Sequence, residues 1–298
     1  HPGTDYPPVC CTGKESKLRM SKSSRFLKGI GKTFLYVLLI IGAIVMIYPL
    51  YSGFVTSLLS EQNISSYPPK LFPVDLHWQN YIDAIHQAPL LRFILNSFIQ
   101  SGGVMILQLI TASLAAFAFA YKPFKGKNIV FLIFLSTMMI PWESTIIPNY
   151  LLIQKMGWDD TYMGLIAPFT ATAFGTFLLR QFFMSIPKDL YDAAKIDGCS
   201  DIRFITNILI PLARPALGTL AVYSFLQTYN QYLWPLLITN NTKMRTVQIG
   251  ITMLQVFERE QWQVVLAGVV IVMIPTLVLF FVANRQLIRG LTAGAIKG

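Results

Sequence analysis

The chain has 298 residues, of which 54% are hydrophobic and only 13% are charged. Soluble domains typically carry about 25% charged residues, so this composition excludes an ordinary water-soluble fold. The formal net charge of +10 must therefore be explained for a chain whose main solvent is lipid.

The first 32 residues are polar and basic. Residues 1–19 show no helical periodicity, whereas the run from Met20 to Lys28 is typical of the start of an inner-membrane protein. We expect residues 1–32 to form a basic cytoplasmic segment, in which residues 1–19 are a candidate non-native extension.

Six apolar runs follow within residues 33–282. A hydrocarbon core is crossed by roughly 20 helical residues, and lipid leaves helix as the only way for such a run to satisfy its backbone groups. The composition predicts an all-α integral membrane protein with six transmembrane helices and a C-terminal tail at 283–298. The runs extend approximately from Thr33 to Leu58, Leu91 to Ala120, Ile129 to Ile140, Met163 to Phe183, Ala216 to Ile238 and Gln263 to Val282.

The positive charges predict the orientation of these helices. With both termini inside, 18 of the 24 lysines and arginines fall in inner segments and six in outer ones. Basic loops stay in the cytoplasm, so we expect both termini there. A nucleic-acid binder would instead gather its basic residues on one face or stripe. The three cysteines show no metal-ligand spacing with the histidines.

The longest predicted outer segment runs from Glu61 to Pro89. Its composition predicts a folded extracytoplasmic loop with a short amphipathic helix around Trp78 to Ile85. Two interpretations stay open, a passive connector and a docking edge for a soluble partner.

A polar island interrupts the apolar runs at Asp192 to Gly198. Acidic residues near a helix start are favoured by the helix dipole, and Gly198 provides a left-handed stop. Ser200 can cap a second helix, which Pro211 and Pro215 would end before the next span begins. The island predicts a helix-turn-helix elbow near the membrane surface.

Side chains of this elbow have two predicted roles. Ala193 and Ala194 would keep one side of the first helix thin, so that another protein can approach its backbone. Leu190, Phe204 and Ile208 would anchor the elbow to the spans. An amphipathic connector settled at the lipid interface is the alternative interpretation.

The spacing of the island resembles a known motif. Asp-Ala-Ala, two residues, Asp-Gly, nine residues, Ile, two residues and Pro is similar to the EAA loop of binding-protein-dependent ABC importer permeases, with Asp192 in place of the usual glutamate. Three further runs resemble the carbohydrate-uptake branch, and within it the second permease of maltose-type and glycerol-3-phosphate-type importers. They are Phe177–Met184, Asn230–Pro235 and Gly290–Gly298.

This resemblance implies a type I importer transmembrane domain in a bacterial cytoplasmic membrane. A second permease subunit, two ATPase subunits and an extracytoplasmic substrate-binding protein would be its partners. ATP and Mg²⁺ would bind to the ATPase subunits, because this chain has no phosphate-binding loop, and the chain would be a transport subunit and no enzyme, without a cofactor of its own. The coupling loop would lie at about residues 184–215. Its expected ATPase contacts are Asp192, Ala193, Ala194, Asp197, Gly198, Ile208 and Pro211.

Polar groups inside membrane spans usually face a cavity or another helix. The candidates for a substrate pathway are Asn96, Gln100, Asn149, Asn230, Gln231 and Trp234, with Gln108, Thr228 and Tyr232 beside them. Hydrogen bonding between helices is the alternative role for each. The substrate class implied is a sugar or a polyol such as sn-glycerol 3-phosphate. We expect no arginine or lysine to be buried inside a span, which favours a neutral sugar. The run Asn230–Pro235 is at least as similar to the glycerol-3-phosphate members, so the ligand stays open.

Two other functions are alternatives to this one. An ion-coupled secondary transporter would place ionisable groups at mid-membrane and show internal repeats. An integral membrane enzyme would need a catalytic group of several residues. Glu143, close to the end of a span, is the one candidate carboxylate for such a group, and it has no second acid or histidine nearby in sequence.

Overall fold

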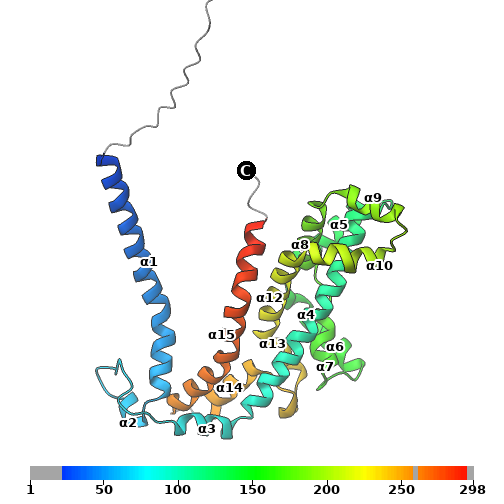
Figure 1. Ribbon diagram of the computed structural model, residues 1–298. Helices are drawn as coiled ribbons and strands as arrows, with labels where there is room; N and C mark the ends of the chain where they lie inside the picture. The colour runs from blue at the N-terminus through cyan, green and yellow to red at the C-terminus, as the bar shows by residue number, and fades with distance from the viewer. Residues whose placement is uncertain (1–21, 258–260, 294–298) are drawn as a thin grey trace, which may run out of the picture. The chain divides into compact units, whose positions relative to one another are not determined.

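The computed structural model describes residues 22–257 and 261–293, and every regular element in that part of the chain is helical (Figure 1). The α-helices are α1 (Lys22–Ser57), α2 (Glu61–Ile64), α3 (Gln79–Gln87), α4 (Leu90–Tyr121), α5 (Lys127–Ser136), α6 (Trp142–Lys155), α7 (Tyr162–Ile166), α8 (Ala173–Met184), α9 (Lys188–Ile196), α10 (Asp201–Phe204), α11 (Ile210–Leu212), α12 (Arg214–Tyr229), α13 (Leu233–Ile238), α14 (Val247–Phe257) and α15 (Trp262–Ala293). Short 3₁₀ turns are η1 (Thr137–Met139), η2 (Ala167–Phe169) and η4 (Thr242–Met244), and η3 (Ile205–Leu209) is a π-helical turn.

The chain divides into two units, residues 1–52 and residues 53–298. The first unit contains most of α1, whose residues 32–57 include an 18-residue window with a mean hydropathy of 2.4. Its large apolar side chains from Phe34 to Leu50 are exposed, as expected for a helix whose solvent is lipid. The predicted segment 1–32 lies mostly outside the described residues, as do residues 294–298 of the predicted tail; α15 continues to Ala293.

Within the second unit, α4 packs against both α8 and α12, and α12 packs against α15 (Figure 1). Helix α4 lies close to α8 and α12 because Ala112, Ala116 and Ala120 repeat at every fourth position of α4 and are buried. Small residues at this spacing let helix backbones approach one another. Leu179 of α8 and Leu220 of α12 complete the same cluster.

Three helices of the described chain are long and apolar enough to cross a membrane, and up to six spans result if each of three bent pairs is one span. The single helices cover residues 32–57, 90–121 and 262–279. The bent pairs are 127–139 with 142–155, 162–169 with 173–184, and 201–212 with 214–229, bent by 95°, 49° and 85°. The all-helical prediction is confirmed, and the predicted third run ends at Met139, with Pro141 at the bend before α6.

The fourth predicted run, Met163 to Phe183, is not one continuous helix. It is interrupted between Phe169 and Ala173. The interruption exposes backbone groups that side chains of α4 satisfy, because Gln108 donates to the carbonyl of Phe169 at 2.7 Å and Thr111 donates to that of Thr170 at 2.8 Å.

The fifth predicted run, Ala216 to Ile238, is also wrong as a single helix. Helix α12 ends at Tyr229, and α13 begins anew at Leu233. Pro235 occupies the third position of α13, where the backbone N–H has no partner within a helix. The proline therefore fits the start of a new helix, and the break lies upstream of it.

The segment between α1 and α4, predicted to be an outer loop, is folded, with α3 at Gln79–Gln87 as its amphipathic helix. The Asn80 amide donates to the carbonyls of Ser57 and Leu59 at 2.9 and 3.0 Å. Ala84 and Ala88 are buried against Val264 and Val265 of α15. Both interpretations of this segment, a passive connector and a docking edge, stay open.

Candidate functional site

The elbow, residues 184–215, consists of α9, a turn at Gly198, and the run α10–η3–α11. Gly198 has a φ of +74°, in the left-handed region that ends many helices. The turn is closed by N–H donation from Gly198 to the carbonyl of Lys195 at 3.0 Å and from Cys199 to that of Ala194 at 2.9 Å. The left-handed stop predicted from sequence is confirmed.

The second arm of the elbow begins as predicted and ends slightly later. The Ser200 hydroxyl accepts the N–H of Arg203 at 3.4 Å and so caps α10. Pro211 does not end the arm, because the preceding turn, η3, is a wider π-turn in which the N–H of Ile210 reaches the carbonyl of Ile205. The chain turns at Ala213, and Pro215 lies in the first turn of α12.

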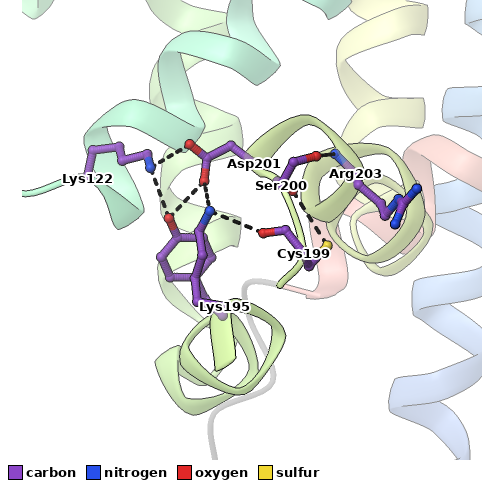
Figure 2. A network of polar contacts seen from close by, with 7 residues as sticks. Lys122, Lys195, Cys199, Ser200, Asp201 and Arg203 are labelled. Carbon is purple, nitrogen blue, oxygen red and sulfur yellow. Dashed lines mark hydrogen bonds and ion pairs between the residues drawn. The ribbon is translucent and has the colours of Figure 1, made fainter. Parts of the chain in front are cut away.

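Asp201 joins three parts of the chain in one polar junction (Figure 2). Its carboxylate oxygens lie 2.6 Å from Nζ of Lys122, which follows α4, and 2.7 Å from Nζ of Lys195 on α9. The hydroxyl of Tyr191 donates to the same carboxylate at 3.0 Å and accepts from Lys122 at 3.0 Å. The junction therefore fixes both arms of the elbow to the end of α4.

An aromatic cluster lies beneath this junction. The ring of Tyr191 is 5.1 Å from that of Tyr121 and 5.0 Å from that of Phe204, measured between centroids, and Phe117 contacts all three rings. Phe204 is fully buried, as expected for an anchor. Ile208 is half-buried against the same core.

Two expectations about the faces of α9 are wrong. Leu190, the predicted anchor, is exposed, and Tyr191 is the residue that packs inward. Ala194 is buried within the chain, so only Ala193 keeps an open side. The inward face of α9 is set by Tyr191 and Ala194, three residues apart, as one helix face requires.

The remaining predicted contact residues of the elbow lie on its outside. Asp192, Asp197, Gly198 and Pro211 are exposed. Sequence reasoning missed Ile196, the last residue of α9, whose exposure is 87%. A large apolar side chain so exposed within a polar segment is the signal that identifies it.

The charges of the junction affect each other's protonation. Hydrogen bonds from Lys122, then Lys195 and Tyr191, hold the pKa of Asp201 well below its usual range. The same carboxylate raises the pKa of Lys122. Asp201 lies outside the predicted span, which begins at Ala216, and about a third of its side chain is exposed, so solvent weakens the pairs.

A hollow of about 610 Å³ lies between α4, α6, α8, α12 and α13. Two of the predicted pathway residues, Gln231 and Trp234, line it, and so do Gln108, Thr228 and Tyr232. Sequence reasoning did not place here the further lining residues Trp142, Glu143, Phe169, Tyr223 and Gln227. Glu143 is the sole charged residue in the described lining.

The other predicted pathway residues do not line the hollow. Asn96 is buried and donates to the carbonyls of Lys243 and Arg245 at 2.9 and 2.8 Å, and it accepts from the hydroxyl of Tyr162 at 2.7 Å. Gln100 is buried and donates to Oε1 of Gln231 at 3.0 Å. These amides hold neighbouring segments together, which is the alternative role considered for them.

Asn149 and Asn230 are also absent from the lining. Asn230 donates to the carbonyl of Leu226 at 2.9 Å, at the end of α12. Asn149 is half-buried on α6.

Trp234 forms a fixed wall rather than a free stacking platform. Its indole N–H donates to the carbonyl of Gly164 at 3.1 Å. Its ring lies edge-on to those of Trp142 and Phe169, at centroid distances of 5.7 and 6.0 Å. Tyr232, beside it, is exposed toward the hollow. No group of three His, Cys, Asp or Glu side chains able to hold a metal ion occurs within the described residues.

A family model described as "Binding-protein-dependent transport system inner membrane component" matches residues 108–291, which include both the elbow and the hollow. The chain belongs to this family. It is an inner-membrane permease, a transport component rather than an enzyme, as the EAA-like spacing indicated.

Relatives of the permease agree with the branch indicated by the sequence. It is 35% identical to the sn-glycerol-3-phosphate transport system permease protein UgpE of Yersinia enterocolitica over 87% of this chain and 95% of that protein. It is 36% identical to UgpE of Pectobacterium atrosepticum and of Escherichia coli O1:K1 with the same coverage.

Solved structures show the same fold. A chain of a bacterial ABC transporter involved in the import of the acidic polysaccharide alginate aligns with a TM-score of 0.78, at 24% identity, over 89% of this permease and 98% of that chain. In the complex of an alginate ABC transporter with a pentasaccharide-bound periplasmic protein, a chain aligns with a TM-score of 0.62 at 17% identity, over 88% and 96%.

Replacing Gly198 should strain the turn without a clash. A Cβ built there meets no atom within 4 Å, so the cost is that of a left-handed backbone, about 1 kcal/mol for alanine. We expect Gly198→Ala to speed hydrogen exchange at residues 197–200 by about fivefold in detergent-solubilised permease. Gly198→Asn is the control, because asparagine adopts this conformation more readily; equal exchange in both variants would contradict the argument.

Removing the carboxylate of Asp201 should loosen the elbow. Because its pKa is lowered in the folded chain, its stabilisation is complete above the ordinary carboxyl pKa of about 4 and is lost as the pH falls toward the folded value. We expect Asp201→Asn to speed limited proteolysis between α9 and α10 at pH 7. The effect should shrink at pH 3, where protonation begins to weaken the wild-type pairs.

Asp192→Asn provides the matched control for that experiment. Asp192 is an exposed carboxylate of the same elbow, and no salt bridge to it occurs among the described residues. Its variant should be cleaved like the wild type, and equal cleavage of all three proteins would show that the junction does not hold the elbow.

Proposed function

We propose that this permease forms, with a second permease subunit, the membrane pathway of an ABC importer for a neutral sugar or polyol. Two separate ATPase subunits would bind and hydrolyse ATP with Mg²⁺, and an extracytoplasmic binding protein would deliver the substrate. The observation that carries the proposal is the hollow, whose described lining is aromatic and amide-rich without a lysine or arginine.

The orientation proposed places both termini and the elbow in the cytoplasm. It is supported by the placement of 18 of the 24 basic residues in the segments that would then be inside. The ion pair between Lys122 and Asp201 holds the elbow against the end of α4, so the two lie on the same side of the membrane. A cytoplasmic elbow is accessible to an ATPase subunit.

The outer surface of the elbow is the proposed ATPase contact. Asp192, Ala193, Asp197 and Gly198 are exposed there, and Ile196 adds an apolar contact that could be buried in a partner's groove. Ile208 and Ala194 would act from within, by holding the elbow to the bundle. Pro211 lies on the exposed side of the second arm.

The substrate class follows from the chemistry of the hollow. Sugars and polyols present hydroxyl groups to amides and phenols and apolar faces to aromatic rings, and Gln227, Tyr223, Gln231 and Trp142 offer these partners. A phosphate is recognised best by arginine or lysine, and Glu143 would repel it. The relatives named for sn-glycerol 3-phosphate nevertheless make that polyol phosphate the necessary comparison in any test.

The ATPase contact can be tested at Ile196. Ile196→Gln removes apolar area that the chain itself does not bury, so folding should be preserved. We expect ATPase activity stimulated by loaded binding protein to fall by about fivefold or more in the assembled transporter, since a lost buried side chain costs at least 1 kcal/mol. Leu76→Gln, at an apolar residue that is 61% exposed in the outer segment, is the control; similar activity of the two variants would remove Ile196 from the contact.

The substrate pathway can be tested at Gln227. Its amide lines the hollow and donates to the hydroxyl of Tyr223, one turn away, at 3.2 Å. Gln154 is a matched control, because it makes the same contact to Tyr150 on α6 outside the hollow. We expect Gln227→Ala to lower uptake of the transported sugar in proteoliposomes about tenfold, since a lost substrate hydrogen bond costs roughly 1–1.5 kcal/mol, and Gln154→Ala to leave it unchanged.

The same uptake assay compares neutral sugars and polyols with sn-glycerol 3-phosphate for the wild type. Uptake of sn-glycerol 3-phosphate without uptake of any neutral sugar or polyol would contradict the proposal of a neutral substrate. It would leave the assignment as a permease intact. Equal uptake by the Gln227→Ala and Gln154→Ala variants would contradict the proposal that the hollow is part of the substrate pathway.

A further inference from the structure

A second pocket, of about 260 Å³, lies where α4 ends and α5 begins, against α8 and the start of α9. Three cationic side chains line it, those of Lys127, Arg180 and Lys188. None of its ten described lining residues is an aspartate or glutamate. The pocket is separate from the hollow and shares no lining residue with it.

The three cations lack acidic partners. Within residues 22–257 and 261–293 the salt bridges formed involve only Asp201 with Lys122 and Lys195. Lys127 donates to the carbonyls of Ala120 and Lys122 at 3.3 and 3.2 Å, and it lies near enough to Arg180 and Lys188 to be repelled by them. Positive charges held this closely without a carboxylate are unfavourable unless an anion neutralises them.

Arg180 is the most constrained of the three. Its guanidinium lies over the ring of Phe131, with Cζ 4.1 Å from the ring centroid. Its Nε is buried and has no hydrogen-bond partner in the described chain. An arginine fixed in this way presents its remaining donors in a planar fork, the geometry that matches phosphate oxygens.

The walls of the pocket are apolar, and they continue onto an apolar surface. Phe119 lines the pocket and contacts Phe131 of α5, with centroids 5.1 Å apart. On α5, the side chains of Ile129, Leu132 and Ile133 are exposed. A charged cavity thus opens at the end of a helix whose outer surface suits acyl chains.

We propose that this pocket binds the phosphate group of an anionic phospholipid, whose acyl chains lie along α5. Free phosphate would satisfy the same cations, but it would make no use of the adjoining apolar surface. Basic pockets between membrane helices are typical sites for anionic headgroups. Lys188 belongs to the elbow, but the pocket shares no lining residue with the hollow or with the proposed ATPase contact residues.

Native mass spectrometry of the full chain in detergent tests the site with phosphatidylglycerol as the probe and phosphatidylcholine as the zwitterionic comparison. We expect the wild type to retain phosphatidylglycerol preferentially. Retention should fall about fivefold for each charge removed, in Lys188→Gln and further in the double variant Arg180→Gln, Lys188→Gln. Lys188 is exposed, so its single variant keeps the test valid if the double variant does not fold.

Lys125→Gln is the matched control, because Lys125 is an exposed lysine of the same connection that does not line the pocket. Equal retention by the wild type, Lys188→Gln and the double variant would overturn the proposal, as would an equal loss in Lys125→Gln. Displacement of the lipid by inorganic phosphate at equal concentration would identify a free-anion site instead. Loss of the lipid on binding of an ATPase subunit would assign the pocket to an acidic segment of that partner.

Discussion

Amide and hydroxyl side chains of α4 satisfy the backbone groups that broken helices leave in an apolar bundle. A buried carbonyl without a partner costs roughly 1–3 kcal/mol, and hydrocarbon offers no water to replace it. Gln108 and Thr111 supply the donors at the break before α8, and Asn96 supplies them at the segment before α14. The single long helix α4 therefore makes the interrupted neighbours possible, and the hollow exists because those neighbours are interrupted.

This use of amide side chains to satisfy backbone groups explains why the pathway residues were only partly predictable. An amide within an apolar run has the same sequence signature whether it faces a cavity or a backbone carbonyl. Asn96 and Gln100 are used for packing, whereas Gln231 both accepts from Gln100 and lines the hollow. Which role applies depends on breaks at Thr170 and Asn230, and these depend on contacts far apart in the sequence.

The elbow shows where sequence reasoning succeeds and where it stops. The Gly198 stop and the Ser200 cap depend on neighbouring residues, so their chemistry could be read directly from the chain. Ala194 is buried in the cluster that includes Ala116 and Phe117 of α4, and Asp201 pairs with Lys122, about 80 residues earlier in the chain. Contacts between segments so far apart leave no pattern in the local sequence. The apolar runs predicted a helical membrane protein. The positions of the helix breaks could not be predicted in the same way, because they depend on the side chains of α4 that satisfy the broken backbone.

Helix α12 connects the elbow with the hollow. Its 16 residues span about 24 Å, from the turn at Ala213 to the break at Asn230. Along that length it packs on α4 and α15, and interiors this closely packed do not deform continuously. A displacement of the elbow would therefore move α12 as a unit. The bend of 85° at its start and the interruption before α13 are the two places where the backbone can accommodate such a movement, and Thr228 and Gln231 of the hollow lie at the second of them.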